Sequence, residues 1–265
     1  MSDGPVTIVS GGGSGIGAAV ARCAADAGHT VVICGRRSDA LQRVADRPRI
    51  HPVVADACDP ADMERLVSAS VARHGRIDHV VANAGIMRSG TVLDTTPEQW
   101  EQVIQANLTS AFLLIRAALP QLLATHGSLV GVSSIAALRA STGAAAYATS
   151  KAAMTMLVRT VAADYGSAGV RANAVCPGWV RTEMADEEMR VFGQEAGLDL
   201  DSAYGAVSRL VPQRRVAEPE EVAAAVLWLL GAEASYVNGA VLTVDGGTTV
   251  VDPGTVGLDF TVTPR

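Results

Sequence analysis

Short runs of β-branched and other apolar residues alternate along the chain with longer, alanine-rich segments. This alternation is typical of a parallel β-sheet that helices cover on both faces, because strands buried on both sides are almost continuously apolar. The predicted strands are Val6–Ser10, Thr30–Cys34, His51–Val54, His79–Ala82, Ser128–Ser133, Arg171–Cys176 and Ala240–Val244. The sequence therefore predicts an α/β fold with a seven-stranded parallel sheet.

Between these strands, apolar residues recur at the spacing of helix faces. The predicted helices are Ile16–Ala27, Leu41–Ala45, Pro60–His74, Pro97–Thr125, Tyr147–Tyr165 and Pro219–Leu230. The fourth of them is expected to bend near Asn107. Gly28, Gly75, Gly127 and Gly169 each stand just before a predicted strand, so we expect them to end helices in the left-handed conformation.

The chain has 265 residues and no linker-like change in composition, so one domain spanning 1–265 is expected. The stretch Glu183–Arg215 is more polar and irregular than the rest, and we expect it to form a substrate-binding lid. The segments Pro97–Thr125 and Tyr147–Tyr165 carry more apolar and small residues than one covered face requires. This composition suggests that a partner covers the second face of both helices.

Charge and composition narrow the function. A net charge of −6 without a basic run argues against a nucleic-acid partner. No membrane-spanning segment is predicted, and the N-terminus lacks the pattern of a secretory signal, so a cytoplasmic location is expected. The four cysteines form no CxxC pair and are expected to be buried thiols. The five histidines form no zinc-like cluster, so no metal is expected.

A glycine-rich turn joins the first strand to the first helix. A Cβ there would hold a pyrophosphate away from the backbone N–H groups at the helix start, so glycines between a strand and a helix predict a dinucleotide-binding site. The residues assigned to this site are Ser10, Gly11, Gly13, Ser14, Gly15, Ile16 and Gly17. The alternative, a flexible turn, would leave the strand–turn–helix context to coincidence.

Tyr147 and Lys151 stand four residues apart, so both project from one face of a helix. An ammonium beside a phenol stabilises the phenolate and is expected to lower the pKa of Tyr147, which lets it protonate a ketone or deprotonate an alcohol. A surface tyrosine packed beside a lysine is the plain alternative. Ser134 ends a predicted strand, and Asn107 in mid-helix competes with backbone hydrogen bonds, so it needs a reason to be there.

Together these motifs resemble the classical short-chain dehydrogenase/reductase family, over roughly Val6–Gly247. The resemblance rests on the glycine spacing G-x-x-x-G-x-G and on the thirteen residues between Ser134 and Tyr147. Ser10 stands where the family usually has threonine. The resemblance implies a Rossmann-type doubly wound sheet and hydride transfer between a nicotinamide dinucleotide and a ketone or secondary alcohol, with Tyr147 as general acid/base.

The resemblance also implies a catalytic tetrad. Ser134 would hydrogen-bond the substrate oxygen and stabilise the developing alkoxide. Lys151 would also hold the nicotinamide ribose. Asn107 would bend its helix, so that a freed carbonyl holds a water and completes a proton path to Lys151. Two other classes stay open: an epimerase or lyase that retains its cofactor, and a nucleotide-binding regulator without catalysis. The regulator would not need Ser134, Tyr147 and Lys151 together.

The end of the second strand bears on the choice of cofactor, because an acidic residue there suits a free 2′-hydroxyl and an arginine suits a 2′-phosphate. By resemblance, Gly35 stands where NAD-dependent members carry Asp, and Arg36 and Arg37 follow. NADP is therefore preferred over NAD, although both arginines would also suit a solvated surface. Further implied cofactor contacts are Asp56, Ala57, Asn83, Ala84, Gly85, Pro177, Gly178, Val180 and Thr182.

The expected substrate is a mid-sized, partly hydrophobic ketone or alcohol. The residues expected around it are Ile135, Ala136, Leu138, Arg139, Met87, Arg88 and the lid from Met184 onward. The resemblance further implies a homotetramer. The tail Thr248–Arg265 is longer than usual in the family, and either reaches a neighbouring active site or is a disordered end.

Overall fold

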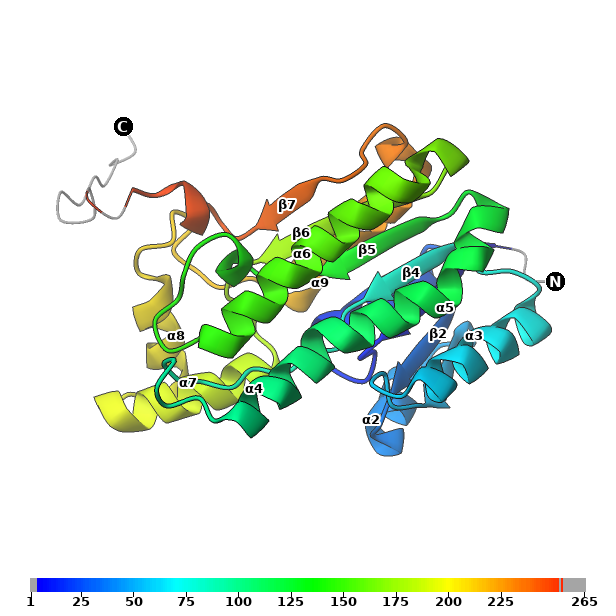
Figure 1. Cartoon of the computed structure of the whole chain (residues 1–265). Coiled ribbons are helices and arrows are strands. Elements are labelled where there is room, and N and C mark those ends of the chain that lie inside the picture. The colour runs from blue at the N-terminus through cyan, green and yellow to red at the C-terminus, as the bar shows by residue number, and fades with distance from the viewer. Residues whose placement is uncertain (1–3, 253, 255–265) are drawn as a thin grey trace, which may run out of the picture.

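The computed structural model describes residues 4–252 and 254 of the chain. It confirms one seven-stranded parallel sheet with the strand order β3-β2-β1-β4-β5-β6-β7 (Figure 1). The strands are β1 (Val6–Ser10), β2 (Thr30–Gly35), β3 (Ile50–Val54), β4 (His79–Ala82), β5 (Ser128–Val132), β6 (Arg171–Pro177) and β7 (Val241–Val244). Their bounds agree with the predicted ones to within one residue at each end, because most of these strands are buried along their length and are therefore clearly apolar in sequence.

The helices of the described chain are α1 (Gly15–Asp26), α2 (Ser38–Val44), α3 (Pro60–His74), α4 (Pro97–Ile104), α5 (Ser110–Thr125), α6 (Ala145–Tyr165), α7 (Glu183–Ala196), α8 (Leu200–Ser208) and α9 (Pro219–Leu230). One helix or more follows each of the first six strands, with α7, α8 and α9 all between β6 and β7. Helix α2 begins three residues earlier than predicted, because its first two residues, Ser38 and Asp39, are polar and exposed and so give no apolar signal.

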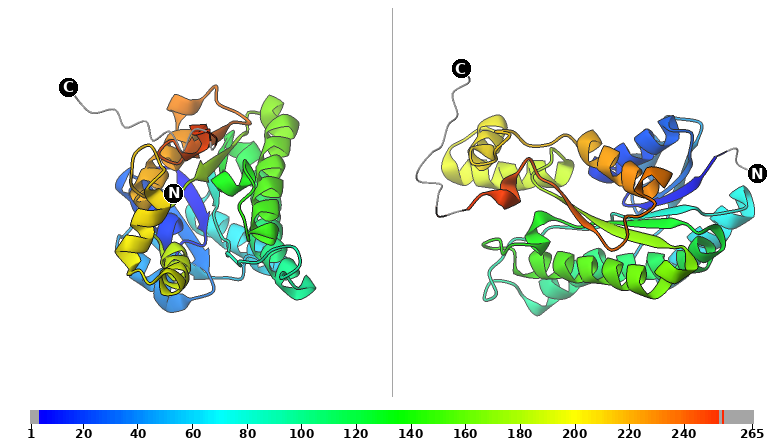
Figure 2. Two further views of the ribbon diagram at one scale, coloured as in Figure 1. Left: turned by 90° about the vertical axis from the view of Figure 1, so that its left-hand side faces the viewer. Right: turned by 90° about the horizontal axis from the view of Figure 1, so that it is seen from above.

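Two apolar layers lie on the two faces of the sheet. One joins α1 and α9 to residues of the central strands such as Val9 and Val130, and the other joins α3, α5 and α6 to residues such as Ile8 and Leu129. Seen from above, the strands run between the two helical layers (Figure 2). This three-layer arrangement leaves the carboxyl ends of the parallel strands at one edge, where loops form a site.

Helices α4 and α5 are joined by a π turn over Gln105–Thr109, which confirms the predicted interruption at Asn107. By length and composition alone, the joined segment Pro97–Thr125 is apolar enough to cross a membrane, yet its α5 part packs on the sheet beside β4. Only 33% of its most apolar stretch is buried within this chain. The segment therefore presents a second apolar face.

The predicted left-handed helix ends hold at Gly28, Gly75 and Gly169, which have φ of 90°, 85° and 86°. The prediction for Gly127 is wrong, because His126 takes the left-handed conformation instead, with φ of 50°. Gly127 has another reason to be glycine. A Cβ there would overlap the carbonyl oxygen of Asp78, so the residue permits close approach of two backbones.

The expectation that Glu183–Arg215 is irregular is also wrong. Helices α7 and α8 occupy most of it and share a small core made of Ala185, Met189, Ala203 and Tyr204. The sequence reads as polar because only one narrow face of each helix is buried.

The four cysteines are free thiols. Cys34 and Cys176 are buried as expected, whereas Cys23 and Cys58 are only half-buried. Of these two, Cys58 lines the cleft described below and Cys23 does not.

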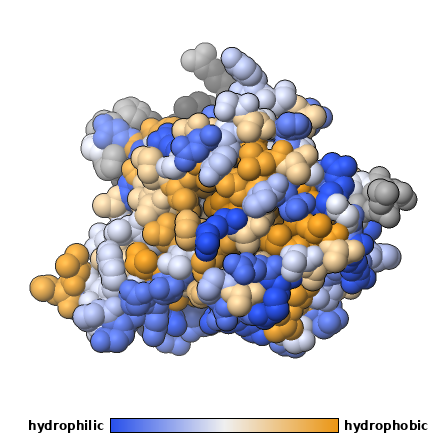
Figure 3. Space-filling model, turned by 45° about the vertical axis from the view of Figure 1, so that its right-hand side comes forward, coloured by the Kyte–Doolittle hydropathy of each residue, from blue (hydrophilic) through white to orange (hydrophobic). Residues whose placement is uncertain are grey.

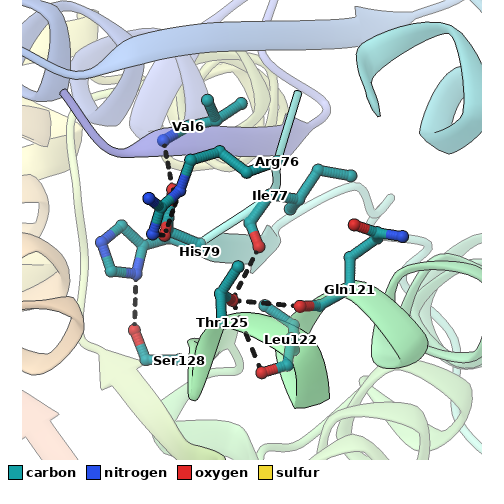
Figure 4. A network of polar contacts seen from close by, with 9 residues as sticks. Val6, Arg76, Ile77, His79, Gln121, Leu122, Thr125 and Ser128 are labelled. Carbon is teal, nitrogen blue, oxygen red and sulfur yellow. Dashed lines mark hydrogen bonds and ion pairs between the residues drawn. The ribbon is translucent and has the colours of Figure 1, made fainter. Parts of the chain in front are cut away.

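A polar network lies at the amino ends of β4 and β5 (Figure 4). His79 Nδ1 lies 2.8 Å from the hydroxyl of Ser128, which donates to the carbonyl of Leu230 at 3.0 Å. Because a serine hydroxyl has one proton to donate, His79 donates to Ser128 through Nδ1. Burial lowers the pKa of His79 to about 4, so the ring is neutral in the folded protein at pH 7.

This network predicts a loss of stability in acid. The pKa of His79 is 6.5 when exposed and about 4 when folded, so its stabilisation is complete above pH 6.5 and declines as pH falls toward 4. At about pH 5 the loss is roughly 2 kcal/mol. We expect the melting temperature to fall more between about pH 7.5 and about pH 5 in the wild type than in His79→Asn, which keeps a donor toward Ser128. An equal fall in both proteins would contradict this assignment.

Candidate active site

A cleft of about 750 Å³ opens at the carboxyl edge of the sheet. Its size is that of a ligand site for a dinucleotide or a large small molecule. It brings together most of the residues that the sequence assigned to cofactor and chemistry. These are Gly11, Gly13, Ser14, Gly15, Ile16, Arg36, Arg37, Asp56, Ala57, Asn83, Ala84, Gly85, Tyr147, Lys151 and Thr182.

The glycine turn forms one wall of the cleft at the start of α1. Gly11 and Gly15 have φ of 63° and 52°, which favours glycine at both positions. A Cβ on Gly17 would overlap the carbonyl of Gly11. Ser14, the N-cap of α1, makes no side-chain capping bond, and the first turn of α1 carries no acidic residue. Its N–H groups and the helix dipole are therefore directed at a space suited to an anion.

Ser10 and Asn83 hold this wall in place from below. The Ser10 hydroxyl accepts hydrogen bonds from the N–H groups of Asn83 and Ala84, both at 3.1 Å. The Asn83 amide donates to the carbonyls of Ser10 at 3.0 Å and Gly11 at 3.2 Å. Ser10 is buried, so it shapes the turn and does not line the cleft.

The arginines that follow β2 have different surroundings. Arg37 donates to the Glu183 carboxylate at 3.1 Å and to the Ser14 hydroxyl at 3.4 Å, so it joins the glycine turn to the start of α7. Arg36 lines the same end of the cleft and has no hydrogen bond or ion pair to another described residue. Of the two arginines that follow β2, Arg36 is thus the one whose guanidinium remains available to a ligand.

Asp56 lies at the end of β3, and its carboxylate accepts from the N–H of Cys58 at 2.9 Å. This bond shapes the loop that closes the cleft beyond Arg36. The loop is further fixed by the Cys58 thiol, which donates to the carbonyl of Gln105 in the π turn at 3.4 Å.

Tyr147 and Lys151 lie on the cleft face of α6, as their spacing predicted. The Lys151 ammonium is 5.8 Å from the centre of the Tyr147 ring and donates to the Val132 carbonyl at 2.9 Å. Lys151 is buried, and that burial lowers its pKa to about 8. The group is therefore held at one position at the end of β5.

The electrostatics of Tyr147 differ from the expectation. Burial raises the pKa of Tyr147 above its usual range, and the charge of Glu188 adds to that effect, while the hydroxyl of Ser134 opposes it. Lys151 does not lower the pKa of Tyr147 as expected, because its ammonium is bound to a carbonyl and lies beside the ring. Tyr147 consequently keeps its proton at neutral pH, which is the form that a proton donor requires.

Asn107 lies in the π turn and is fully buried. Its amide oxygen accepts from the N–H of Ile86 at 2.7 Å, and its amide nitrogen donates to the Ile86 carbonyl at 3.0 Å and the Ser150 hydroxyl at 2.9 Å. Asn107 therefore ties the loop after β4 to α6, one residue before Lys151, and does not line the cleft.

The remaining predicted residues lie around the cleft. Ser134 follows β5, accepts from the N–H of Ala136 at 3.1 Å and faces Tyr147. Ser133, and not Ser134, lines the cleft, and its hydroxyl donates to the Lys151 carbonyl at 2.9 Å. The other predicted cofactor contacts, Gly17, Pro177, Gly178 and Val180, do not line the cleft. Thr182 lines the cleft and caps α7 by accepting from the N–H of Ala185.

Of the residues expected around the substrate, Arg88 and Met184 line the cleft, whereas Arg139 donates to the carbonyls of Thr248 and Val251. The rest of the tail after residue 254 lies outside the described residues. Sequence reasoning missed a group of lining residues on α4 and the π turn, Glu101, Gln102, Gln105 and Ala106. Their position within two turns of Asn107 was the signal that pointed to them.

The residues present fit a nicotinamide dinucleotide. The glycine turn offers N–H groups to a pyrophosphate, Arg36 and Asp56 lie at the far end where an adenosine would be held, and Tyr147 and Lys151 lie at the other. The dinucleotide, when bound, supplies or accepts the hydride. The chain itself positions a phenol, a hydroxyl and an ammonium beside it.

Comparison with known proteins agrees with this site. The sequence profile described as enoyl-(acyl carrier protein) reductase matches residues 11–249. Protein MoaE of Klebsiella aerogenes is 44% identical over 251 residues, which cover 93% of this chain and 96% of that protein. Meso-2,3-butanediol dehydrogenase of Serratia marcescens is 34% identical over 257 residues, covering 94% and 96%. The solved structure of levodione reductase has a TM-score of 0.88 at 31% identity, covering 94% of this chain and 98% of that one.

Fold and site thus define a dinucleotide-dependent oxidoreductase of alcohol and ketone groups. The chain belongs to the short-chain dehydrogenase/reductase family. An actinorhodin polyketide ketoreductase with the same fold, at a TM-score of 0.88 and 30% identity over 94% of this chain and 98% of that one, was solved with NADPH.

Proposed function

We propose that this enzyme interconverts a ketone and a secondary alcohol with NADP as its preferred cofactor, and that Tyr147 moves the proton. One observation carries the proposal: Tyr147 and Lys151 share a single cleft with the glycine turn. A phenol that keeps its proton at neutral pH donates it to the ketone oxygen as charge develops there.

In this proposal the other polar groups bind the substrate oxygen and stabilise the phenolate of Tyr147. The Ser134 hydroxyl faces Tyr147, so both donors meet at one substrate oxygen and stabilise an alkoxide. Lys151 stabilises the phenolate left after proton transfer. Asn107 acts through position, because it holds Ile86 and Ser150 on either side of Lys151.

The test is a panel of ketones and secondary alcohols assayed with both NAD and NADP, in which the absorbance of the reduced nicotinamide is followed. We expect a net change in the absorbance of the reduced nicotinamide with at least one ketone or alcohol. Substrate conversion without any net change would instead indicate a cofactor-retaining epimerase or lyase.

The preference for NADP rests on Arg36. Its guanidinium lies at the end of β2 and has no protein partner in the described chain, while its neighbour Arg37 is engaged by Glu183. Arginine binds phosphate through two parallel hydrogen bonds, which an unpaired guanidinium offers to a 2′-phosphate.

Replacement of Arg36 by glutamine is expected to raise the KM for NADP by about tenfold to hundredfold, the loss of one charge-assisted contact, and to leave the KM for NAD nearly unchanged. Arg43→Gln is the control, because Arg43 is paired with Asp39 on the surface. Steady-state kinetics with both cofactors measure the ratio of the KM for NADP to the KM for NAD. An unchanged ratio in Arg36→Gln would remove Arg36 from cofactor selection.

We also propose a cytoplasmic homotetramer. Apolar side chains gather in the middle of the face that carries α5 and α6 (Figure 3). Large apolar residues there are exposed within one chain, with Phe112 at 46% and Met156 at 59%. A second copy of the chain is suited to cover such a face, because the same two helices of both copies pack together and remove their apolar side chains from water.

A further inference from the structure

Helix α7 carries a carboxylate that neither the fold nor the proposed mechanism uses. Three acidic residues that precede it on the helix are each bound by a side chain: Glu183 by Arg37, Asp186 by Tyr204 and Glu187 by Arg190. Glu188 is half-buried, and no hydrogen bond or ion pair joins it to any residue in the described part of the chain.

Glu188 lies on the face of α7 that is turned toward Tyr147. Met184, Glu188 and Val191 follow one another at spacings of four and three, so they share one side of the helix. Met184 lines the cleft together with Tyr147. A different side of α7, with Ala185 and Met189, is buried against α8. Glu188 is therefore one helical turn beyond a residue that lines the cleft, outside the lining itself and near enough for its charge to act on Tyr147.

The surroundings of Glu188 are apolar and lack a positive charge. Met184 and Val191, on either side of it, are 44% and 51% exposed within the chain. Burial raises the pKa of Glu188, and its charge raises the pKa of Tyr147, so the two groups sense each other. A half-buried carboxylate without a cation is costly, and a ligand that brings one recovers that cost.

We propose that Glu188 is a specificity-determining residue whose carboxylate binds an ammonium group of the substrate, so that amino alcohols and amino ketones are preferred. The proposal deepens the proposed function and rests on it. Met184, between Glu188 and the cleft, contacts the hydrocarbon that joins the ammonium group to the reacting carbon. A substrate hydroxyl would satisfy one hydrogen bond but leave the negative charge without compensation.

The test compares alcohols that differ in a single group. Isopropanolamine and sec-butanol differ by an ammonium in place of a methyl group, propylene glycol places a hydroxyl there, and lactate carries a carboxylate. The same series lengthened by one and two methylenes finds the span to Glu188. In the wild type, at the best chain length, we expect kcat/KM for the amine to exceed that for the methyl compound by about tenfold to hundredfold.

In Glu188→Gln this ratio should fall to near one. The ratio is the proper measure, because any effect on Tyr147 itself is common to both substrates and cancels. Glu187→Gln is the matched control, since Glu187 is adjacent, exposed and paired with Arg190. It should keep the wild-type ratio. The melting temperature of each variant shows whether it is folded.

A second readout needs no turnover. In the presence of the dinucleotide, n-butylammonium should raise the melting temperature of the wild type more than n-butanol does, and this difference should vanish in Glu188→Gln. Equal kcat/KM for amine and methyl compounds with equal melting shifts would overturn the proposal while leaving the ketone and alcohol activity intact. Preference for the diol, or for lactate through Arg88, would also overturn it.

Discussion

Replacing Tyr147 with phenylalanine will lower kcat by about 10²–10⁴-fold, the contribution expected of a positioned proton donor. The substitution removes one hydroxyl and keeps the ring, so the packing of α6 and the contact with the Lys151 ammonium are preserved. Because that hydroxyl does not shape the glycine turn, affinity for the dinucleotide should change by less than about twofold. Single-turnover kinetics and titration of the reduced cofactor by fluorescence measure the two quantities.

The matched control is Tyr165→Phe, which removes a hydroxyl from the last residue of the same helix, far along the chain from the cleft. It should keep wild-type kcat. If Tyr147→Phe retained wild-type turnover, another group would have to carry the proton, and the proposed mechanism would fail.

Gly17→Ala will abolish tight binding of the dinucleotide and destabilise the fold. A Cβ at this position would overlap the carbonyl of Gly11 and lie 2.5 Å from the amide nitrogen of Asn83. Both atoms belong to the hydrogen-bonded wall of the cleft, so the turn must shift. Overpacking of this kind costs about 1–3 kcal/mol, which corresponds to a fall in melting temperature of roughly 2–12 °C. The dissociation constant of the cofactor should rise at least about tenfold.

Gly35→Ala provides the comparison, because Gly35 also lines the cleft but a Cβ there would lie 3.7 Å from Leu41, an ordinary contact. Calorimetry and cofactor titration on both variants decide the matter. Similar behaviour of the two variants would show that the close approach of Gly17 to Gly11 is not what keeps the turn in shape.

The sequence predicted the sheet and most helices because their signals are local. The first strand, Val6–Ser10, and the helices Pro60–His74 and Pro219–Leu230 appear with the predicted bounds. The glycine turn and the pairing of Tyr147 with Lys151 on one helix face were also readable, since each depends on residues close together in the chain.

The start of α2 and the helices α7 and α8 were missed because their exposed residues are polar, whereas the other misses involve contacts that are distant in the sequence. Gly127 is glycine because of Asp78, a residue of another loop. The raised pKa of Tyr147 arises from burial and from Glu188 on α7, neither of which its own helix reveals. Likewise, Gln105 and Glu101 reach the cleft only because the π turn sets the direction of α4. Periodicity alone cannot report these effects, because tertiary packing determines them.

The π turn at Gln105–Thr109 has a consequence for how this chain tolerates change. Such a turn accommodates one residue more than a regular helix does. Deleting a single residue here would let α4 and α5 run on as one regular helix with little rotation between them, because the wide turn takes up the extra residue. A deletion within the regular turns of α4 would instead rotate the residues before it by about 100° and turn Glu101 away from the cleft. Surface loops can lengthen or shorten freely, whereas the regular turns of α4 are bound to their present residue count.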